Sequence, residues 1–315
     1  NRLLRHSLYF SNIKEQVGEG NSADAEFILF NSLYPLPQGI VSLRYPTNHY
    51  YSFPHELSDN GYTTAAFVGM EKAFMNMGVM LPKYGFKQIY PISSFQLKEK
   101  IGLGLADGEM FPQALERIRT LPKPFFAYLI TLTNHVPYYL PTSMQNKELR
   151  KGISNQRVRD YLQTVHYVDH VFGDFLDKFH KLGLDKDTVL VIYGDHEGVN
   201  KYYSKDVDNS GLQWIKNNKI VPLIIYHPSL KGKEVKELGG QVDILPTVEH
   251  LLNIHQDYRM RYRVGRNLLL SQASFAITQN GEYLTKRQPN EELKSFRLLG
   301  PEMSLKVIQA DLFVE

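Results

Sequence analysis

The chain has 315 residues, of which 43% are hydrophobic and 22% charged, a balance typical of a globular protein rather than a disordered one. Its formal net charge of +3 is too small to indicate nucleic-acid binding. The absence of cysteine excludes disulfide bonds, zinc–cysteine sites and a cysteine nucleophile. No run of 18 apolar residues occurs, so no segment of this chain is expected to span a membrane.

The first informative segment is residues 18–39. Gly18 and Gly20 form a flexible approach, and Ser22 stands where a helix should begin, before an apolar run that must end near Pro35. One interpretation is that Ser22 is the helix N-cap, a position that serine favours. The other is that its hydroxyl is a nucleophile, placed beside free backbone N–H groups that favour an incoming phosphate.

The middle of the chain alternates between strands and helices. Residues 52–60 predict a short helix, residues 62–68 a strand, and residues 104–121 a loop followed by a helix. A continuous apolar strand is predicted over residues 125–132, and His135 lies just past its carboxyl end. A lone histidine there is more often packed than catalytic, so its role depends on which strand lies beside it.

The longest predicted helix covers residues 157–182, where apolar residues recur at spacings of three and four. A short β-branched run follows over residues 189–193 and predicts a strand buried on both faces. A strand, a long helix and a second strand form a βαβ unit, in which the two strands are parallel. We therefore expect His135 and the residues after Tyr193 to emerge at one edge of a sheet.

Gly194 ends the second strand, and Asp195 and His196 follow it at once. In open α/β sheets, ligands collect at the carboxyl ends of the strands. Carboxylate oxygen and imidazole nitrogen are also good ligands for a divalent transition metal. The alternative interpretation is that the three residues form an ordinary turn.

Beyond this point we predict a strand at 220–226, a helix at 243–252 and a terminal hairpin that pairs 275–277 with 282–284. The predicted fold class is α/β, with a mostly parallel central sheet and helices on both faces. We expect residues 1–260 to form the main domain. We expect residues 261–315 to form a small C-terminal subdomain, a β-hairpin with an α+β portion, packed on it.

Five blocks of the sequence occur in the order found in one known family. The chain resembles the extracellular catalytic domain of the lipoteichoic acid synthases, within the alkaline phosphatase and sulfatase superfamily. The blocks are GEGNSADAEFILFNSLYPLPQG, GYTTAAFVG, KPFFAYLITLTNHVPY, TVLVIYGDHEG and GGQVDILPTVEHLLNI. The first and fourth are specific only in combination. The five blocks are spread over residues 18–254, so the resemblance extends over most of the chain.

The resemblance implies roles for particular residues. Ser22 falls on the position of the family's nucleophilic threonine, which is also a metal ligand. Asp195 and His196 fall on two further metal ligands, and His135 falls on a substrate-binding histidine. Lys72 and Phe74 match residues of the family's phosphoglycerol pocket. The implied cofactor is one divalent metal, typically Mn2+, with Mg2+ or Zn2+ as alternatives.

Three departures from the family qualify this reading. Ser22 replaces threonine, although the hydroxyl is retained. The family's remaining metal ligand is a glutamate on a first strand that should precede Asn1. Because Asn1 is not a methionine, we expect the chain to be part of a longer protein. Val68, Met75 and Met77 stand where the family has polar pocket residues, which predicts that phosphatidylglycerol is a poor donor unless these side chains are packed in the core.

The leading functional hypothesis is a metal-dependent transferase that moves a phosphorylated head group from a phospholipid donor to an envelope glycan or polymer acceptor. The covalent intermediate would form on Ser22. We expect it to act on the extracytoplasmic face of a bacterial membrane, tethered through segments absent from this chain. A phosphodiesterase or phosphatase, in which water replaces the acceptor, is the second hypothesis. A catalytically silent domain that binds an envelope polymer is the third.

Overall fold

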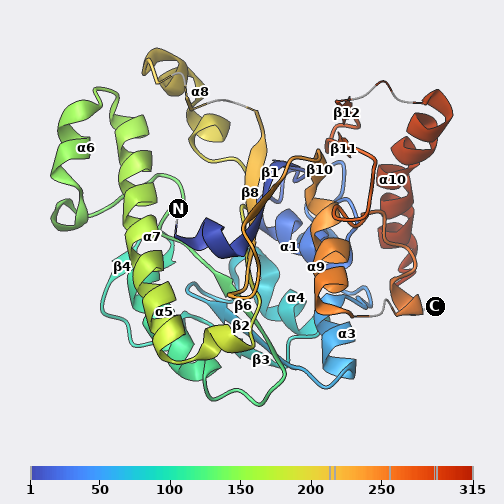
Figure 1. Ribbon diagram of the computed structural model, residues 1–315, viewed down its shortest axis with the longest axis horizontal. Helices are drawn as coiled ribbons and strands as arrows, with labels where there is room; N and C mark the ends of the chain where they lie inside the picture. The colour runs from blue at the N-terminus through green and yellow to red at the C-terminus, as the bar shows by residue number, and fades with distance from the viewer. Residues whose placement is uncertain are drawn as a thin grey trace.

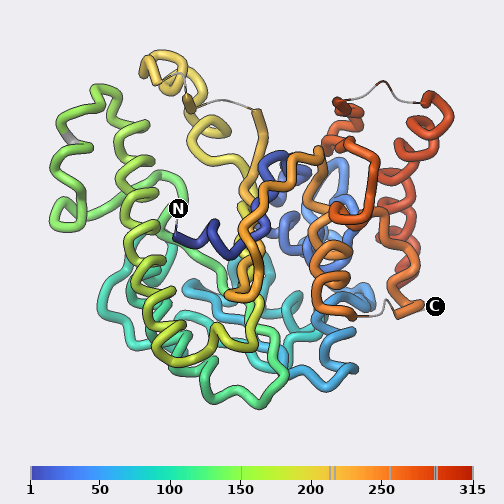
Figure 2. Tube along the Cα trace, viewed as in Figure 1, coloured from blue at the N-terminus to red at the C-terminus, as the bar shows by residue number. Residues whose placement is uncertain are grey.

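The computed structural model describes residues 2–212, 214–215, 218–254, 257–286, 288 and 290–313. Two β-sheets occupy the middle of the molecule, and helices cover both flanks (Figure 1). The helices are α1 (Ser22–Asn31), α2 (Val41–Arg44), α3 (Phe53–Asp59), α4 (Met77–Lys83), α5 (Asp107–Ile118), α6 (Lys147–Gly152), α7 (Gln156–Lys181), α8 (Val199–Asn209), α9 (Ile244–Leu252) and α10 (Glu291–Ala310). Helices α5 and α7 pack together on one flank, and α9 and α10 lie on the other (Figures 1 and 2). None of the described helices is both long enough and apolar enough to cross a membrane.

The larger sheet is mixed. Its strands are β1 (Ser7–Lys14), β7 (Leu190–Tyr193), β8 (Ile220–Tyr226), β9 (Lys233–Val235) and β10 (Gly239–Gly240). The order is β10-β1-β8-β7, and β9 also pairs with β1. Strand β8 is antiparallel to both of its neighbours, whereas β9 and β10 are parallel to β1.

The smaller central sheet is parallel throughout. Its strands are β2 (Thr63–Val68), β3 (Gln88–Tyr90) and β6 (Phe125–Ile130), in the order β3-β2-β6. Two short antiparallel pairs complete the strands, β4 (Lys100–Ile101) with β5 (Gly104–Leu105), and β11 (Phe275–Ile277) with β12 (Tyr283–Thr285). The second of these pairs confirms the predicted terminal hairpin. The α/β class with helices on both flanks is likewise confirmed.

The prediction that β6 and β7 belong to one sheet is wrong. Among the described strands, β6 pairs with β2 alone and β7 with β8 alone, so the two belong to different sheets. Every residue of both strands is partly exposed, whereas the sequence predicted burial on both faces. The hydroxyl groups of Tyr128 and Tyr193 nevertheless lie 3.2 Å apart. The two strands therefore face each other without sharing backbone hydrogen bonds.

Helix α1 is buried on nearly all sides. Phe27 and Phe30 pack into an apolar core with the small sheet and α4, while Ala25 and Ile28 pack toward the hairpin β11–β12. A helix that is apolar all round is buried in the middle of a protein rather than amphipathic at its surface. The first residue of this rigid helix is Ser22.

Strand β1, helix α8 and helix α10 are among the elements that were not predicted from the sequence. Helix α10 places Val307 and Ile308 in the same core as Phe27. The C-terminal segment is therefore packed on the rest of the chain. The division of the chain at residue 260 stays a prediction.

Candidate active site

The chain changes from apolar to polar residues where β7 ends. The backbone N–H of Gly194 donates to the carbonyl of Pro222, which extends the pairing with β8 by one residue. A Cβ atom at Gly194 would lie 2.8 Å from Pro222 Cδ, closer than real Cβ atoms approach, and 3.0 Å from the Cβ of Val221, a tight contact. A larger residue would therefore force the end of β7 or Pro222 to shift, and glycine lets the chain leave the sheet toward Asp195 without that shift.

Ser22 and Asp195 are brought together by this arrangement. The Ser22 hydroxyl donates to Asp195 Oδ2 at 2.6 Å, the short distance typical of a hydrogen bond to a carboxylate. The capping interpretation is wrong, because the N-cap residue is Asn21 and the Ser22 hydroxyl bonds to Asp195 instead. No described side chain caps the start of α1. The Ala23 N–H donates to the Gly20 carbonyl at 2.9 Å, so among the described contacts the N–H groups of Ser22 and Asp24 are the ones left for an anion.

The loop before Ser22 is held by a buried carboxylate. Asp24 Oδ2 accepts hydrogen bonds from the backbone N–H groups of Gly18 at 2.9 Å and Gly20 at 3.0 Å. Burial raises the pKa of Asp24 to about 6, and the two backbone bonds oppose that rise. A Cβ atom at Gly20 would collide with the Asp24 carboxylate. Glycine is thus required for the chain to fold over Asp24 and reach Ser22.

His196 is oriented by its own backbone environment. Its Nδ1 lies 2.8 Å from the carbonyl oxygen of Glu197, an acceptor, so Nδ1 carries the proton in the neutral ring. The other ring nitrogen, Nε2, lies 3.6 Å from Asp195 Oδ2. The side chain of His196 is 11% exposed and that of Asp195 is 44% exposed. The Tyr202 ring of α8 packs edge-on against the imidazole, with 6.2 Å between ring centroids.

Three donor atoms therefore converge: Ser22 Oγ, Asp195 Oδ2 and His196 Nε2. A hydroxyl, a carboxylate and a neutral imidazole suit a divalent transition metal. Bonding of Nδ1 to a carbonyl is also the usual outer-shell arrangement of a metal-binding histidine. Within the described ranges, no three His, Asp or Glu side chains group closely enough to hold a metal by themselves. The donor set fits a metal but leaves room for a further ligand.

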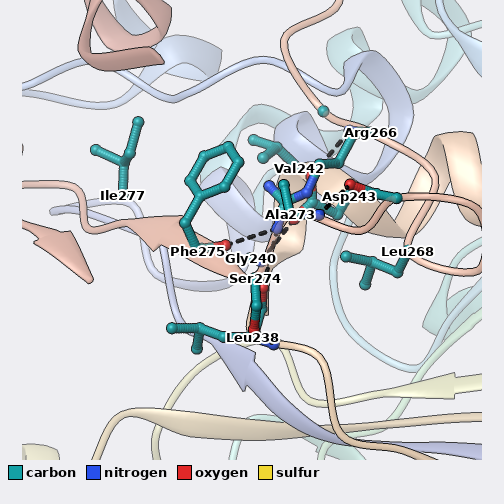
Figure 3. Close-up of polar contacts among 12 residues, drawn as sticks. Leu238, Gly240, Val242, Asp243, Arg266, Leu268, Ala273, Ser274, Phe275 and Ile277 are labelled. Atoms are coloured by element: carbon teal, nitrogen blue, oxygen red, sulfur yellow. Dashed lines mark hydrogen bonds and ion pairs between the residues drawn. The ribbon is translucent and has the colours of Figure 1, made fainter. Parts of the chain in front are cut away.

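Gln241 supports the backbone of this loop and was not predicted from the sequence. Its Nε2 donates to the Asp195 carbonyl at 2.6 Å. It begins a turn fastened by a buried network, drawn in Figure 3, in which Asp243 accepts from the backbone N–H groups of Gly240 and Arg266, both at 2.9 Å. Burial raises the pKa of Asp243, and the charge of Arg266 opposes this. The network fixes the position from which Gln241 reaches the loop.

Glu26 is a second residue that the sequence did not single out. It lies one turn after Ser22, is 5% exposed, and its Oε1 has no hydrogen-bond partner among the described residues. Burial, and to a lesser extent the charge of Asp195, raises the pKa of Glu26 to about 8. The carboxyl group is therefore mostly neutral at pH 7 and adds little negative charge beside Asp195.

His135 lies on the loop after β6, as predicted, and is partly exposed. Its Nδ1 lies 2.7 Å from the Val136 carbonyl oxygen, which leaves Nε2 free. It forms no hydrogen bond with Ser22, Asp195 or His196 among the described contacts. The loop is tied to the helices around the site, because the ring of Tyr138 packs on rings from α7 and α8.

The segment that was expected to form the head-group pocket is divided. Lys72 and Phe74 are exposed, and Met75 is partly exposed with a left-handed backbone at φ 46°. Val68 and Met77, by contrast, are 1% and 3% exposed and lie in the apolar core with α1. The prediction that these two residues line the pocket is wrong, because β2 and α4 turn their side chains inward.

Comparison with known proteins identifies close relatives. A family model described as Sulfatase matches residues 1–254. Lipoteichoic acid synthases 2 and 1 of Bacillus subtilis are each 31% identical, over 298 and 289 residues, and the matches cover 89% of this chain. The chain spans only 44% and 45% of those two proteins.

Two solved structures share the fold. The lipoteichoic acid synthase LtaP from Listeria monocytogenes superimposes with a TM-score of 0.84 at 24% identity, covering 99% of this chain and 85% of the other. The phosphoglycerol transferase GacH from Streptococcus pyogenes, in complex with sn-glycerol-1-phosphate, gives a TM-score of 0.62 at 16% identity. That match covers 99% of this chain and 80% of GacH.

Proposed function

The chain belongs to the sulfatase family, and on that premise we propose that it is the catalytic part of a metal-dependent phosphotransferase. The reaction is transfer of a phosphoglycerol-type head group from a phospholipid to a hydroxyl group of an envelope glycan or polymer. The observation that carries the proposal is the 2.6 Å hydrogen bond from the Ser22 hydroxyl to Asp195, at the open N-terminus of a buried helix.

In the first half-reaction, Ser22 Oγ attacks the phosphorus atom and forms a phosphoester, while the bond from phosphorus to the lipid oxygen breaks. Asp195 Oδ2 already accepts the hydroxyl hydrogen, so it is placed to take the proton and release it to solvent, and the departing diacylglycerol oxygen, on the opposite side of the phosphorus atom, takes a proton from solvent. In the second half-reaction an acceptor hydroxyl attacks the same phosphorus, and its proton returns to Ser22 as the ester breaks. Atoms and charge balance over the cycle.

Ser22, Asp195 and His196 are the residues proposed to hold the divalent metal, manganese first, with magnesium or zinc as alternatives. Bound there, the metal supplies Lewis-acid chemistry that lowers the pKa of the Ser22 hydroxyl and offsets charge on the phosphoryl oxygens. The backbone N–H groups of Ser22 and Asp24, which have no partner among the described contacts, can bond to the same anion. The rigid burial of α1 keeps the nucleophile in one position.

The further metal ligand is proposed to come from an additional strand between β6 and β7. Within the part of the chain that the structure describes, each of these strands is paired on one edge, and every residue of both is partly exposed. Apolar strands with open edges are suited to accept another strand. A glutamate at the end of that strand, as the family resemblance implies, would complete the ligand shell.

Substrate contacts are assigned to His135, Lys72 and Phe74. The Nε2 atom of His135 is free to bond to a phosphoryl oxygen or the acceptor hydroxyl. Lys72 is exposed and can pair with the phosphate, while Phe74 offers an apolar wall. Because Val68 and Met77 are core residues, the argument against phosphatidylglycerol fails, and a phosphoglycerol head group is the proposed cargo.

Location and partners are proposed by analogy with the relatives. The Bacillus subtilis proteins are lipoteichoic acid synthases, and GacH was solved with sn-glycerol-1-phosphate. We extend from them a phospholipid donor, an envelope polymer acceptor and an extracytoplasmic position at the membrane, with tethering by other segments of the protein.

A product assay with the full-length protein tests the proposal. Vesicles of phosphatidylglycerol are incubated with Mn2+, with and without a hydroxylated glycan acceptor, and diacylglycerol and modified acceptor are quantified. A transferase produces both in equal amounts. Release of free glycerol phosphate without acceptor modification would identify a hydrolase, and no product under either condition would support the silent binding domain.

A further inference from the structure

Glu15 lies just beyond β1 and reaches the loop that carries the proposed metal ligands. Its carboxylate accepts a hydrogen bond from the backbone N–H of Glu197, the residue directly after His196. The same carboxylate pairs with Lys201 in the first turn of α8 at 3.2 Å. The Glu15 side chain is only 7% exposed, so solvent screens these contacts weakly.

The backbone at Glu15 and Gln16 is itself held by hydrogen bonds. The backbone N–H of Glu15 donates to the Lys219 carbonyl at 2.8 Å, and that of the next residue, Gln16, donates to Gln241 Oε1 at 2.7 Å. Gln241 in turn donates to the Asp195 carbonyl. Two neighbouring residues of β1's extension thus hold the loop on both sides of His196.

These contacts fix the orientation of the His196 imidazole ring. Glu197 is held at its N–H by Glu15, and its carbonyl oxygen is the acceptor that lies 2.8 Å from His196 Nδ1. If Glu197 rotated, that carbonyl would move and the Nδ1–H would lose its acceptor. Either ring nitrogen could then carry the proton, and Nε2 would no longer be reserved for the metal.

We propose that Glu15 is a positioning residue, which acts through the backbone of Glu197 to hold His196 with Nε2 free for the metal. The proposal rests on the function proposed above, because it takes His196 as a metal ligand. Glu15 itself touches neither the metal nor the substrate. Its contribution is the hydrogen bond that it accepts, so an amide at this position should largely replace it.

The test has a metal-free and a metal-bound part. In the metal-free chain labelled with 15N-histidine, NMR should show a single His196 tautomer protonated at Nδ1 in the wild type and in Glu15→Gln. Glu15→Ala should show a mixture of tautomers. In the full-length protein, calorimetric titration with Mn2+ should give a Kd raised roughly 10- to 100-fold in Glu15→Ala and changed much less in Glu15→Gln.

Glu249→Ala is the matched control, since Glu249 is also a buried carboxylate in an ion pair, with Arg263. It should lower the melting temperature while leaving the His196 tautomer and the Kd unchanged. Equal effects of Glu15→Ala and Glu15→Gln, or a wild-type tautomer and Kd in Glu15→Ala, would overturn the proposal. Failure of the wild type to bind Mn2+ would instead count against the proposed function, and the metal-free tautomer would still decide the role of Glu15.

Discussion

The hydroxyl of Ser22 and the carboxylate of Asp195 form a 2.6 Å hydrogen bond across 173 positions of sequence. Ser22 is the first residue of a helix buried on nearly all sides, and Asp195 lies two residues after the end of β7. Because the helix that carries Ser22 and the strand that precedes Asp195 are both held in place, the distance between the two side chains is set before any substrate binds. Such preorganisation is where enzymes obtain much of their rate enhancement.

Gly194→Ala is expected to weaken the site while leaving a folded protein. The new Cβ would meet Pro222 and must displace the end of β7, which moves Asp195 away from Ser22. We expect Mn2+ affinity to fall by about tenfold or more in calorimetric titration. The control is Gly173→Ala in α7, where the added carbon meets nothing within 4 Å and should stabilise the helix by roughly 0.5–1 kcal/mol. Unchanged affinity in Gly194→Ala would show that the glycine does not position Asp195.

Asp195→Asn and His196→Gln should each lower the metal content of the full-length protein. Either change replaces one of the three converging ligands by a weaker amide and keeps a polar side chain of similar length, so the fold should persist. Elemental analysis after dialysis against Mn2+ measures the metal directly, and circular dichroism checks the fold. If both variants retain the wild-type metal content, the pair is structural and the metal lies elsewhere.

Glu26 should make stability fall with increasing pH. Its pKa is raised by burial to about 8, above the value of an exposed glutamate, so the folded state holds a proton that the unfolded state releases. The favourable contribution is complete below about pH 4 and is lost as pH rises toward 8. Glu26→Gln has no carboxyl group at this position, so its folded state does not bind this proton. Urea unfolding of the metal-free chain at pH 5 and pH 8 should therefore show a smaller loss for the variant, by an amount on the order of 1–3 kcal/mol.

An equal loss in wild type and Glu26→Gln would contradict this assignment. Asp24 also has a raised pKa, but it contributes equally to both proteins and cancels in the comparison.

Lys72→Ala should raise the KM for the lipid donor by about tenfold with a smaller effect on kcat, since the lysine is proposed to pair with the phosphate in the bound state. Met77→Leu is the matched control from the same segment. It is a volume-conserving change in the core, so donor kinetics should not change and stability should fall by less than about 1.5 kcal/mol. If Met77→Leu changed the donor preference and Lys72→Ala did not, the head-group pocket would be lined by the methionines rather than by Lys72.

The sequence was most informative where one local pattern determines one element. The apolar run behind Ser22 predicted α1, and the β-branched run before Gly194 predicted β7. Strand β1 was not predicted because its alternation of apolar and polar residues is broken. Ser11 and Asn12 interrupt the apolar residues, and the pairing with β8 shifts register there, between Phe10 and Ile13. In α10 the breakers Gly300 and Pro301 stand inside the helix and hide its pattern.

For the site, the sequence indicated the reacting residues but not their supports. Glu15 meets the backbone of Glu197 from 182 positions away, and nothing in its own segment marks it as functional. The burial of Val68 and Met77 likewise depends on how β2 and α4 pack against α1. Long-range contacts of this kind follow from tertiary packing, which a local pattern does not contain.

Intact-mass analysis of the full-length protein tests the central claim most directly. The protein is mixed with phosphatidylglycerol and Mn2+ without acceptor, quenched in acid and compared with Ser22→Ala, which should remain folded and lose activity by about a thousandfold or more. We predict a phosphoglycerol adduct that peptide mapping places on Ser22 and that is missing from the variant. An adduct of the same mass in Ser22→Ala, or full turnover by that variant, would show that Ser22 is not the nucleophile.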